Sequence, residues 1–184
     1  MKNAARVLGC AVVLGLASAG TTAAVNPPTP GLTNSEGSID ITLEVTQGIQ
    51  IKGLDDIALS LDGVAAGTDL VGRDTFCVGA RGFSNYTIQF DSANAATGFQ
   101  LTSAAQNLNY NVAFSDVTAD TETGTDVTNA DGTLAQKYAP KAGYGCADET
   151  VHNAQVIVTV PSTVWETATE TSYTDTLTIT VSGE

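Results

Sequence analysis

The chain has 184 residues, with 20 Asp and Glu against seven Lys and Arg, so its formal net charge is −13. A surface this acidic repels nucleic-acid phosphates and anionic lipids, which argues against nucleic acid as a partner and against insertion into a membrane. We interpret the acidity chiefly as a means of keeping the protein soluble.

The N-terminal part is typical of an export signal. Lys2 and Arg6 form its positive region, and the apolar core Val7–Leu16 is too short to cross a bilayer as a helix. We place cleavage after Ala24, with Ala19 as the alternative. Five basic and all 20 acidic residues lie beyond Ala24, so the exported chain carries a net charge of −15. About 160 residues remain, enough for one domain that buries close to two-thirds of its surface.

A Pro- and Gly-rich leader, residues 25–37, precedes a segment in which apolar and polar side chains alternate. Alternation with a period of two predicts a strand with one apolar face. The apolar positions of its first part are Ile39, Ile41, Leu43 and Val45. Ile49 and Ile51 follow after an interruption at residues 46–48, and we assign them to the body of the domain.

The rest of the chain has the composition of an all-β protein, rich in Val, Ile, Thr, Tyr and Phe. Alternating or apolar runs predict strands at residues 75–78, 86–90, 108–114, 156–160 and 177–181. The acidic, Thr-rich stretch 116–132 reads as a long surface loop, and Pro161-Ser162 can begin one short helical turn. About seven strands in this length predict an antiparallel β-sandwich of immunoglobulin type.

Two cysteines, Cys77 and Cys146, lie beyond the signal. An even pair in an exported chain is most simply one disulfide. The sequence offers little for catalysis, because His152 is its one histidine and no nucleophile, zinc or phosphate-binding motif accompanies it. We expect no enzymatic activity, no metal and no cofactor. Trp165 and Tyr173 could bind sugars, but we favour a role in closing the ends of the sandwich.

Three segments together resemble the archaic chaperone–usher pilins, the family that includes the spore coat protein U domain. These are Gly37–Thr46, the strands from Phe76 through Tyr86–Phe90 to Leu108–Asp116, and the closing segment Ser172–Val181 with its Tyr-Thr-Asp-Thr-Leu pattern. Many relatives carry a cysteine just after the N-terminal strand, where this chain has Gln47-Gly48-Ile49, so its disulfide joins different elements.

The resemblance implies an immunoglobulin-like sandwich that lacks its final strand and leaves an apolar groove with unpaired edges. A periplasmic chaperone would fill the groove until, at the outer-membrane usher, the N-terminal strand of the next subunit replaces it. The end of the chain directly after the closing strand agrees with this expectation. It assigns the donor strand to Ile39, Ile41, Leu43 and Val45, and the acceptor groove to Leu177, Ile179 and Val181.

We therefore expect a structural subunit of a pilus or fimbria, exported through the periplasm to the cell surface, with copies of itself or sister pilins, the chaperone and the usher as partners. Its function would be adhesion or biofilm formation. The expected divisions are a signal peptide (1–24), a leader with donor strand (25–47) and a sandwich domain (48–184). The alternative is a self-complete secreted β-sandwich that binds carbohydrate or another surface ligand and pairs residues 38–45 within its own sheet.

Overall fold

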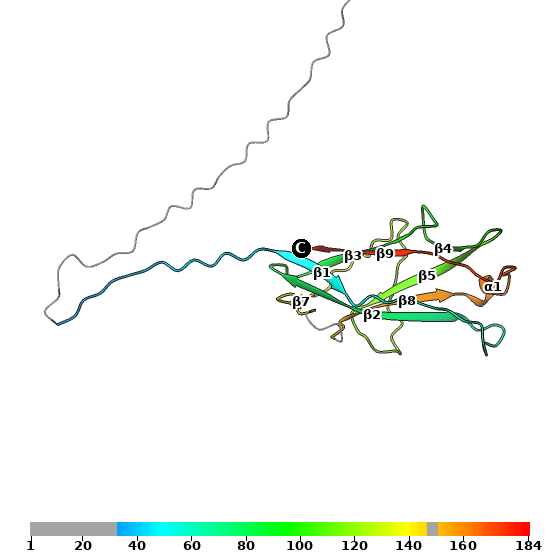
Figure 1. Cartoon of the computed structure of the whole chain (residues 1–184), viewed down its shortest axis with the longest axis horizontal. Helices are drawn as coiled ribbons and strands as arrows, with labels where there is room; N and C mark the ends of the chain where they lie inside the picture. The colour runs from blue at the N-terminus through cyan, green and yellow to red at the C-terminus, as the bar shows by residue number, and fades with distance from the viewer. Residues whose placement is uncertain (1–32, 147–150) are drawn as a thin grey trace, which may run out of the picture. The chain divides into compact units, whose positions relative to one another are not determined.

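The computed structural model describes residues 33–146 and 151–184 (Figure 1). The expected signal peptide and the start of the leader therefore lie outside the described residues. The chain divides into two units, residues 1–44 and 45–184. The second unit contains all the named strands and is the folded β-body of the chain.

The strands form two sheets, in agreement with the expected all-β class. The larger sheet has the order β1-β2-β8-β5-β4, and the smaller one pairs β3 with β9. All of these pairs are antiparallel, while short β6 adds to β5 and β7 runs parallel to part of β2. The bounds are β1 Gly48–Lys52, β2 Leu70–Arg81, β3 Tyr86–Ser92, β4 Phe99–Thr102, β5 Asn107–Ser115, β6 Thr125–Asp126, β7 Lys141–Ala142, β8 Ala154–Val160 and β9 Leu177–Gly183.

The alternation in the sequence decides which face of each strand is buried. In β5, Leu108, Tyr110 and Val112 are buried, whereas the asparagines between them are exposed. β8 is buried almost throughout because β2 and β5 flank it and other segments cover both of its faces. The sequence of the central strand β8 is therefore a nearly continuous apolar run, whereas that of its neighbour β5 alternates between apolar and polar residues.

Aromatic side chains from both sheets fill the space between the layers. Phe76 of β2 and Phe90 of β3 both pack against Phe114 of β5, with ring centroids about 6 Å apart. Tyr138 meets Phe114 edge-on at 4.6 Å, although it belongs to a loop. Such rings contribute most of the apolar area of a small core, so this cluster holds the two layers together.

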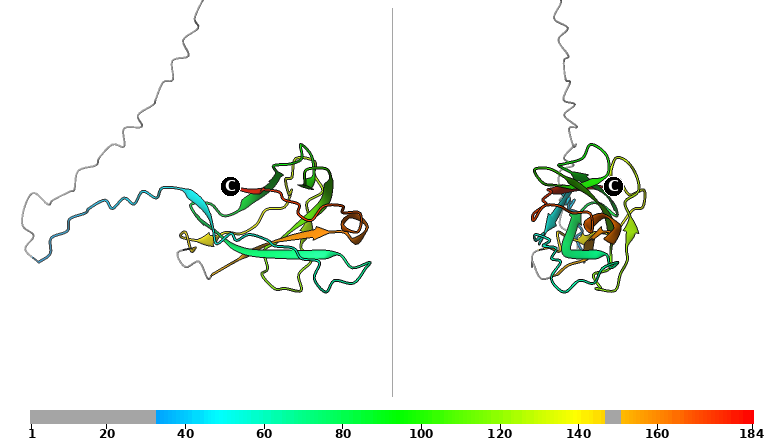
Figure 2. Two further views of the ribbon diagram at one scale, coloured as in Figure 1. Left: turned by 45° about the vertical axis from the view of Figure 1, so that its right-hand side comes forward. Right: turned by 90° about the vertical axis from the view of Figure 1, so that its right-hand side faces the viewer.

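The larger sheet curls toward the smaller one along one side (Figure 2). There β4 approaches the segment before β9, and Thr102 forms an isolated antiparallel bridge with Thr174. A single helical turn, α1 Ser162–Trp165, follows Pro161 as expected and closes this end. The Trp165 indole N–H donates to the Thr68 carbonyl at 2.9 Å, which ties the turn to the loop before β2.

The expected strands 75–78, 86–90, 108–114, 156–160 and 177–181 all lie within observed strands. The sequence did not indicate β4, β6 or β7, and the expected long loop at 116–132 contains β6. β2 starts at Leu70, five residues before its predicted start. The prediction began late because Gly72-Arg73-Asp74 interrupt the apolar pattern, although these residues still pair with β8.

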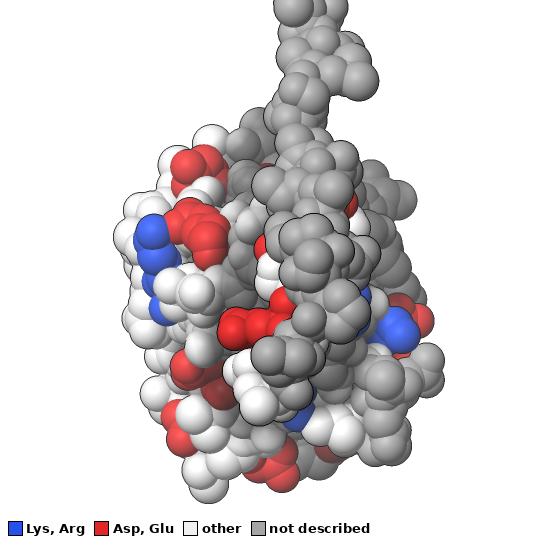
Figure 3. All heavy atoms as spheres, turned by 90° about the vertical axis from the view of Figure 1, so that its left-hand side faces the viewer, with Lys and Arg blue, Asp and Glu red and all other residues white. Residues whose placement is uncertain are grey.

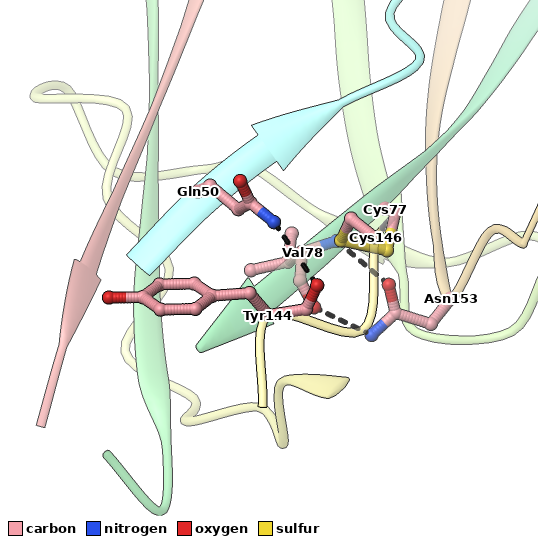
Figure 4. The surroundings of a disulfide bond; sticks show 6 residues. All are labelled: Gln50, Cys77, Val78, Tyr144, Cys146 and Asn153. Atoms are coloured by element: carbon pink, nitrogen blue, oxygen red, sulfur yellow. Dashed lines mark hydrogen bonds between the residues drawn. A yellow bond between two sulfur atoms is a disulfide. The ribbon is translucent and has the colours of Figure 1, made fainter. Parts of the chain in front are cut away.

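The predicted disulfide joins Cys77 on β2 to Cys146, which follows β7 (Figure 4). Both cysteines are fully buried. Next to them the Asn153 side chain accepts a hydrogen bond from the Val78 N–H and donates to the Val78 carbonyl. An amide side chain thus substitutes for a strand at this point of β2, which satisfies the backbone beside the disulfide.

Replacing both Cys77 and Cys146 by Ala should lower the free energy of unfolding by about 4 kcal/mol, since the bond closes a loop across 69 positions of sequence. Denaturant titration of the exported protein and the double variant measures the difference. Thiol titration of the denatured, non-reduced exported protein should find no reactive thiol, and two reactive thiols per chain would contradict the pairing.

Candidate functional site

One edge of β9 has no strand hydrogen-bonded to it in the described part of the chain, although β1 packs close to β9. Glu184 and Asn85 exchange backbone hydrogen bonds at 2.8 and 3.2 Å, and the Ala93 N–H donates to the Thr176 carbonyl at 3.0 Å. Because antiparallel partners alternate, the even-numbered residues of β9 bond to β3. The N–H and C=O groups of the odd-numbered residues therefore point toward the open edge.

The odd-numbered side chains of β9 point into the space between the sheets. Leu177, Ile179 and Val181 are half-buried and pack against the core, while the threonines between them are exposed. These three are the residues to which the resemblance assigned the acceptor groove. The open edge and the apolar face therefore belong to the same residues, so one added strand could reach both.

A groove of about 520 Å³ opens beside this edge. Leu177 and Ile179 of β9 form part of its lining, while Val181 lies outside it. Val156 and Val158 of β8 also line it, and so do Ile57 and Leu59 from the irregular segment 53–60 that follows β1. The structure thus brings two of the three expected acceptor residues to one groove, whose lining combines aliphatic and acidic side chains.

The segment 53–60 is one of the parts of the groove that the sequence did not indicate. Ile57 and Leu59 are half-buried and alternate with exposed Ala58 and Ser60, a strand-like pattern in a segment without strand pairing. A Cβ at Gly72 would overlap the ends of both the Ile57 and Leu59 side chains, so glycine lets this segment lie close to β2. The alternation Ile-Ala-Leu-Ser-Leu at 57–61 was the available signal.

Polar groups from three elements meet at one end of the groove. Asp175 accepts hydrogen bonds from the Tyr110 hydroxyl at 2.6 Å and from the Ser92 hydroxyl at 2.7 Å. Burial, together with this carboxylate, raises the pKa of Tyr110 above its usual range. These hydrogen bonds connect β3 and β5 to the segment before β9.

The expected donor residues precede β1, three of them in the first unit and Val45 at the start of the second. Ile39, Ile41, Leu43 and Val45 are 73, 87, 84 and 53 % exposed, respectively. No named strand includes residues 38–45. Four large apolar side chains of one parity are thus open to solvent, an arrangement that marks a binding segment more often than chance exposure.

The start of β1 is held to neighbouring loops by several contacts. The Gln47 side-chain amide donates to the Gly82 carbonyl at 2.8 Å, and that of Gln50 donates to the Tyr144 carbonyl at 3.3 Å (Figure 4). Tyr144 packs so closely on Gly48 that a Cβ there would overlap its ring and hydroxyl. The disulfide at Cys146 holds this loop in place, so it also supports the start of β1.

His152, the one histidine, is not among the residues that line the groove. His152 lies 2.5 Å from the Thr75 hydroxyl, measured from its Nδ1 atom. Among the described residues, no group of three His, Cys, Asp or Glu side chains could hold a metal ion. Acidic side chains are spread over the face in Figure 3, with basic ones at isolated places.

Comparisons with protein-family models, with curated proteins and with solved structures found no match to this chain. Within residues 33–146 and 151–184, the one helical turn is far too short to cross a bilayer, and no other helix occurs.

Two tyrosines on the inner faces of the sheets should respond oppositely to loss of the hydroxyl. Tyr86 is buried, and its hydroxyl has no hydrogen-bond partner among the described residues, whereas Tyr110 donates to Asp175. Tyr86→Phe should raise the free energy of unfolding by about 1 kcal/mol, and Tyr110→Phe should lower it by about 2 kcal/mol. Denaturant titration measures both, and a loss of stability in Tyr86→Phe would contradict the unpaired hydroxyl.

The buried Tyr86 also predicts how the stability of the fold depends on pH. Burial raises the pKa of Tyr86 above the value near 10 of an unfolded tyrosine. Above about pH 10 the unfolded chain releases this proton while the folded chain retains it, so stability falls as the pH rises. Tyr86→Phe should weaken that fall.

Proposed function

We propose that this chain is a structural subunit of a surface pilus or fimbria, assembled through the chaperone–usher route by donor-strand exchange. The observation that carries the proposal is the unpaired edge of β9, which opens on a groove partly lined by aliphatic side chains. The exposed, alternating segment 38–45 supplies the complementary strand.

The strand order supports an immunoglobulin-type sandwich without its last strand. In the constant-type fold, strands A, B, E and D form one sheet and C, F and G the other. Here β1, β2, β8 and β5 follow one another in the larger sheet, as A, B, E and D do, and β3 pairs with β9 as C does with F. The place of G is the open edge of β9, to which no described strand is hydrogen-bonded.

The segment 38–45 suits this place in both polarity and period. Its odd-numbered side chains are apolar, and Asp40, Thr42 and Glu44 lie between them. An inserted strand would turn its apolar face to Val156, Val158 and Ile179 and its polar face to solvent, beside the exposed threonines of β9. Backbone hydrogen bonds along β9 then provide affinity, and the apolar side chains provide specificity.

The exposure of residues 38–45 also favours the pilin over a self-complete module, because that alternative requires them to pair within their own sheet. In the proposed route, the periplasmic chaperone occupies the groove first, and the outer-membrane usher directs the exchange for the donor strand of a copy or a sister pilin. The assembled fibre at the cell surface serves adhesion or biofilm formation.

Leu43→Asp should abolish fibre assembly while the subunit is still exported and chaperone-bound. Removing the leucine contact alone costs about 2 kcal/mol, close to thirtyfold in affinity, and a buried carboxylate costs more. Thr42→Asp is the matched control, since it adds the same charge on the face turned away from the groove. Electron microscopy of surface fibres measures assembly, and fibres of normal length in Leu43→Asp would rule out residues 38–45 as the donor.

Two variants mixed together test the donor and the acceptor at once. Leu43→Asp keeps the groove without a working donor, and Ile179→Asp keeps the donor without a working groove. Each should remain monomeric alone, whereas the mixture should form a heterodimer that cannot grow, because its remaining donor and groove are both defective. Size-exclusion chromatography with light scattering measures the mass of each sample.

The matched control for Ile179→Asp is Thr180→Asp, which lies on the exposed face of β9 and should still polymerise. Thermal unfolding shows whether Ile179→Asp retains its fold. A folded Ile179→Asp variant that forms fibres alone would contradict the assignment of the groove.

A further inference from the structure

One carboxylate lies among the apolar residues that line the groove. On β2 the even-numbered residues face the space between the sheets, as buried Phe76 and Val78 do. Asp74 belongs to this series, stands opposite Val156 in the register with β8 and lines the groove with it. A strand inserted along β9 would therefore place aliphatic side chains over a half-buried carboxylate.

The groove lining around Asp74 includes a hydrogen-bond donor but no Lys or Arg that could neutralise its negative charge. It accepts a hydrogen bond from the Asp55 N–H at 3.0 Å. The charged or titratable groups that face it are the Asp55 carboxylate on the segment 53–60 and His152 before β8. Asp56 and Asp175 are the other acidic residues of the groove, whose lining contains no Lys or Arg.

Together, these surroundings raise the pKa of the Asp74 carboxyl. Burial is the main cause that raises the pKa of the Asp74 carboxyl, and the charge of Asp55 adds to it. The hydrogen bonds from the Asp55 and Thr75 N–H groups and the charge of His152 oppose the rise without cancelling it. The carboxyl is thus already easier to protonate than an ordinary aspartate before any strand binds.

We propose that Asp74 is the specificity-determining residue of the groove: it must take up a proton when an aliphatic donor strand covers it, and in its ionised form it weakens binding of such a strand. The inference rests on the proposed function, with residues 38–45 of a second copy as the occupant. It adds to that function a rule for which strands the groove accepts.

The direction of the pH dependence follows from the loss of water around the Asp74 carboxyl when a strand binds. The apolar face of the donor, Ile39, Ile41, Leu43 and Val45, offers neither a hydrogen-bond donor nor a positive charge. Covering the carboxyl with it disfavours the ionised form, so the proton is held more tightly in the bound state than in the free state. Binding is then coupled to proton uptake, and affinity rises as the pH falls. A strand with a basic or amide side chain at this point would instead bind the ionised form.

The experiment measures binding of a labelled synthetic strand to the exported full chain by fluorescence anisotropy between about pH 5 and about pH 8. The acceptor carries Leu43→Asn, so that it cannot donate its own strand. The strand spans residues 37–46 with Asp40→Asn and Glu44→Gln, which removes its own titrating groups. The test variant is Asp74→Asn, whose amide oxygen can still accept the hydrogen bond from Asp55.

The matched control is Asp91→Asn, an exposed residue of β3 outside the groove lining, which makes the same change of charge. The parent acceptor and Asp91→Asn should bind about tenfold more weakly at the high end of the pH range, which corresponds to a bound-state pKa about one unit higher. Asp74→Asn should bind at the high end about as tightly as the parent does at the low end, with little pH dependence.

The outcomes separate this inference from the function on which it rests. Binding by all acceptors with the same pH dependence in Asp74→Asn as in the parent overturns the role of Asp74 and leaves the groove as the donor site. It would assign the titration to a group other than Asp74. An absence of binding in every acceptor at every pH overturns the proposed function and this inference together.

Discussion

The open edge of β9 is the constraint on which the rest of this structure depends. Its odd-numbered residues direct their backbone groups to an edge without a strand and their apolar side chains into the space between the sheets. Water can form hydrogen bonds with these backbone groups, but the apolar side chains beside them then stay exposed to water as well. A strand with one apolar face meets both needs, and the threonines on the other side of β9 can remain in solvent.

The remaining elements keep that edge accessible and in place. β3 holds β9 along its whole length on one side, and the bridge between Thr102 and Thr174 fixes the approach to it. On the far side of the groove, Gly72 lets Ile57 and Leu59 lie against β2 without a strand of their own. The groove is therefore bounded by one regular strand and one irregular segment, and the disulfide at Cys77 supports the sheet between them.

The sequence predicted well those parts that depend on local alternation. β5 and β9 follow from their period of two, and the disulfide follows from the number of cysteines beyond the signal. The groove could not be predicted from the sequence, because alternation identifies the apolar face of a strand but not the residues that cover that face. Asp74 shows the same limit: its polar character interrupted the predicted strand, whereas pairing with β8 carries β2 through it. The inward position of that carboxylate depends on register, which requires the partner strand to be known.

The acidity of the chain is physically consistent with an open edge. An uncovered strand with apolar side chains can pair with any similar edge, and natural proteins restrain this tendency with charge. The proposed donor and acceptor both carry carboxylates, with Asp40 and Glu44 on the donor segment and Asp55 and Asp56 in the lining of the groove. Repulsion acts at long range and opposes every encounter equally, whereas strand pairing acts only in the correct register. A high negative charge therefore suppresses irregular association more than it weakens a fully inserted strand, whose binding comes from backbone hydrogen bonds and apolar burial.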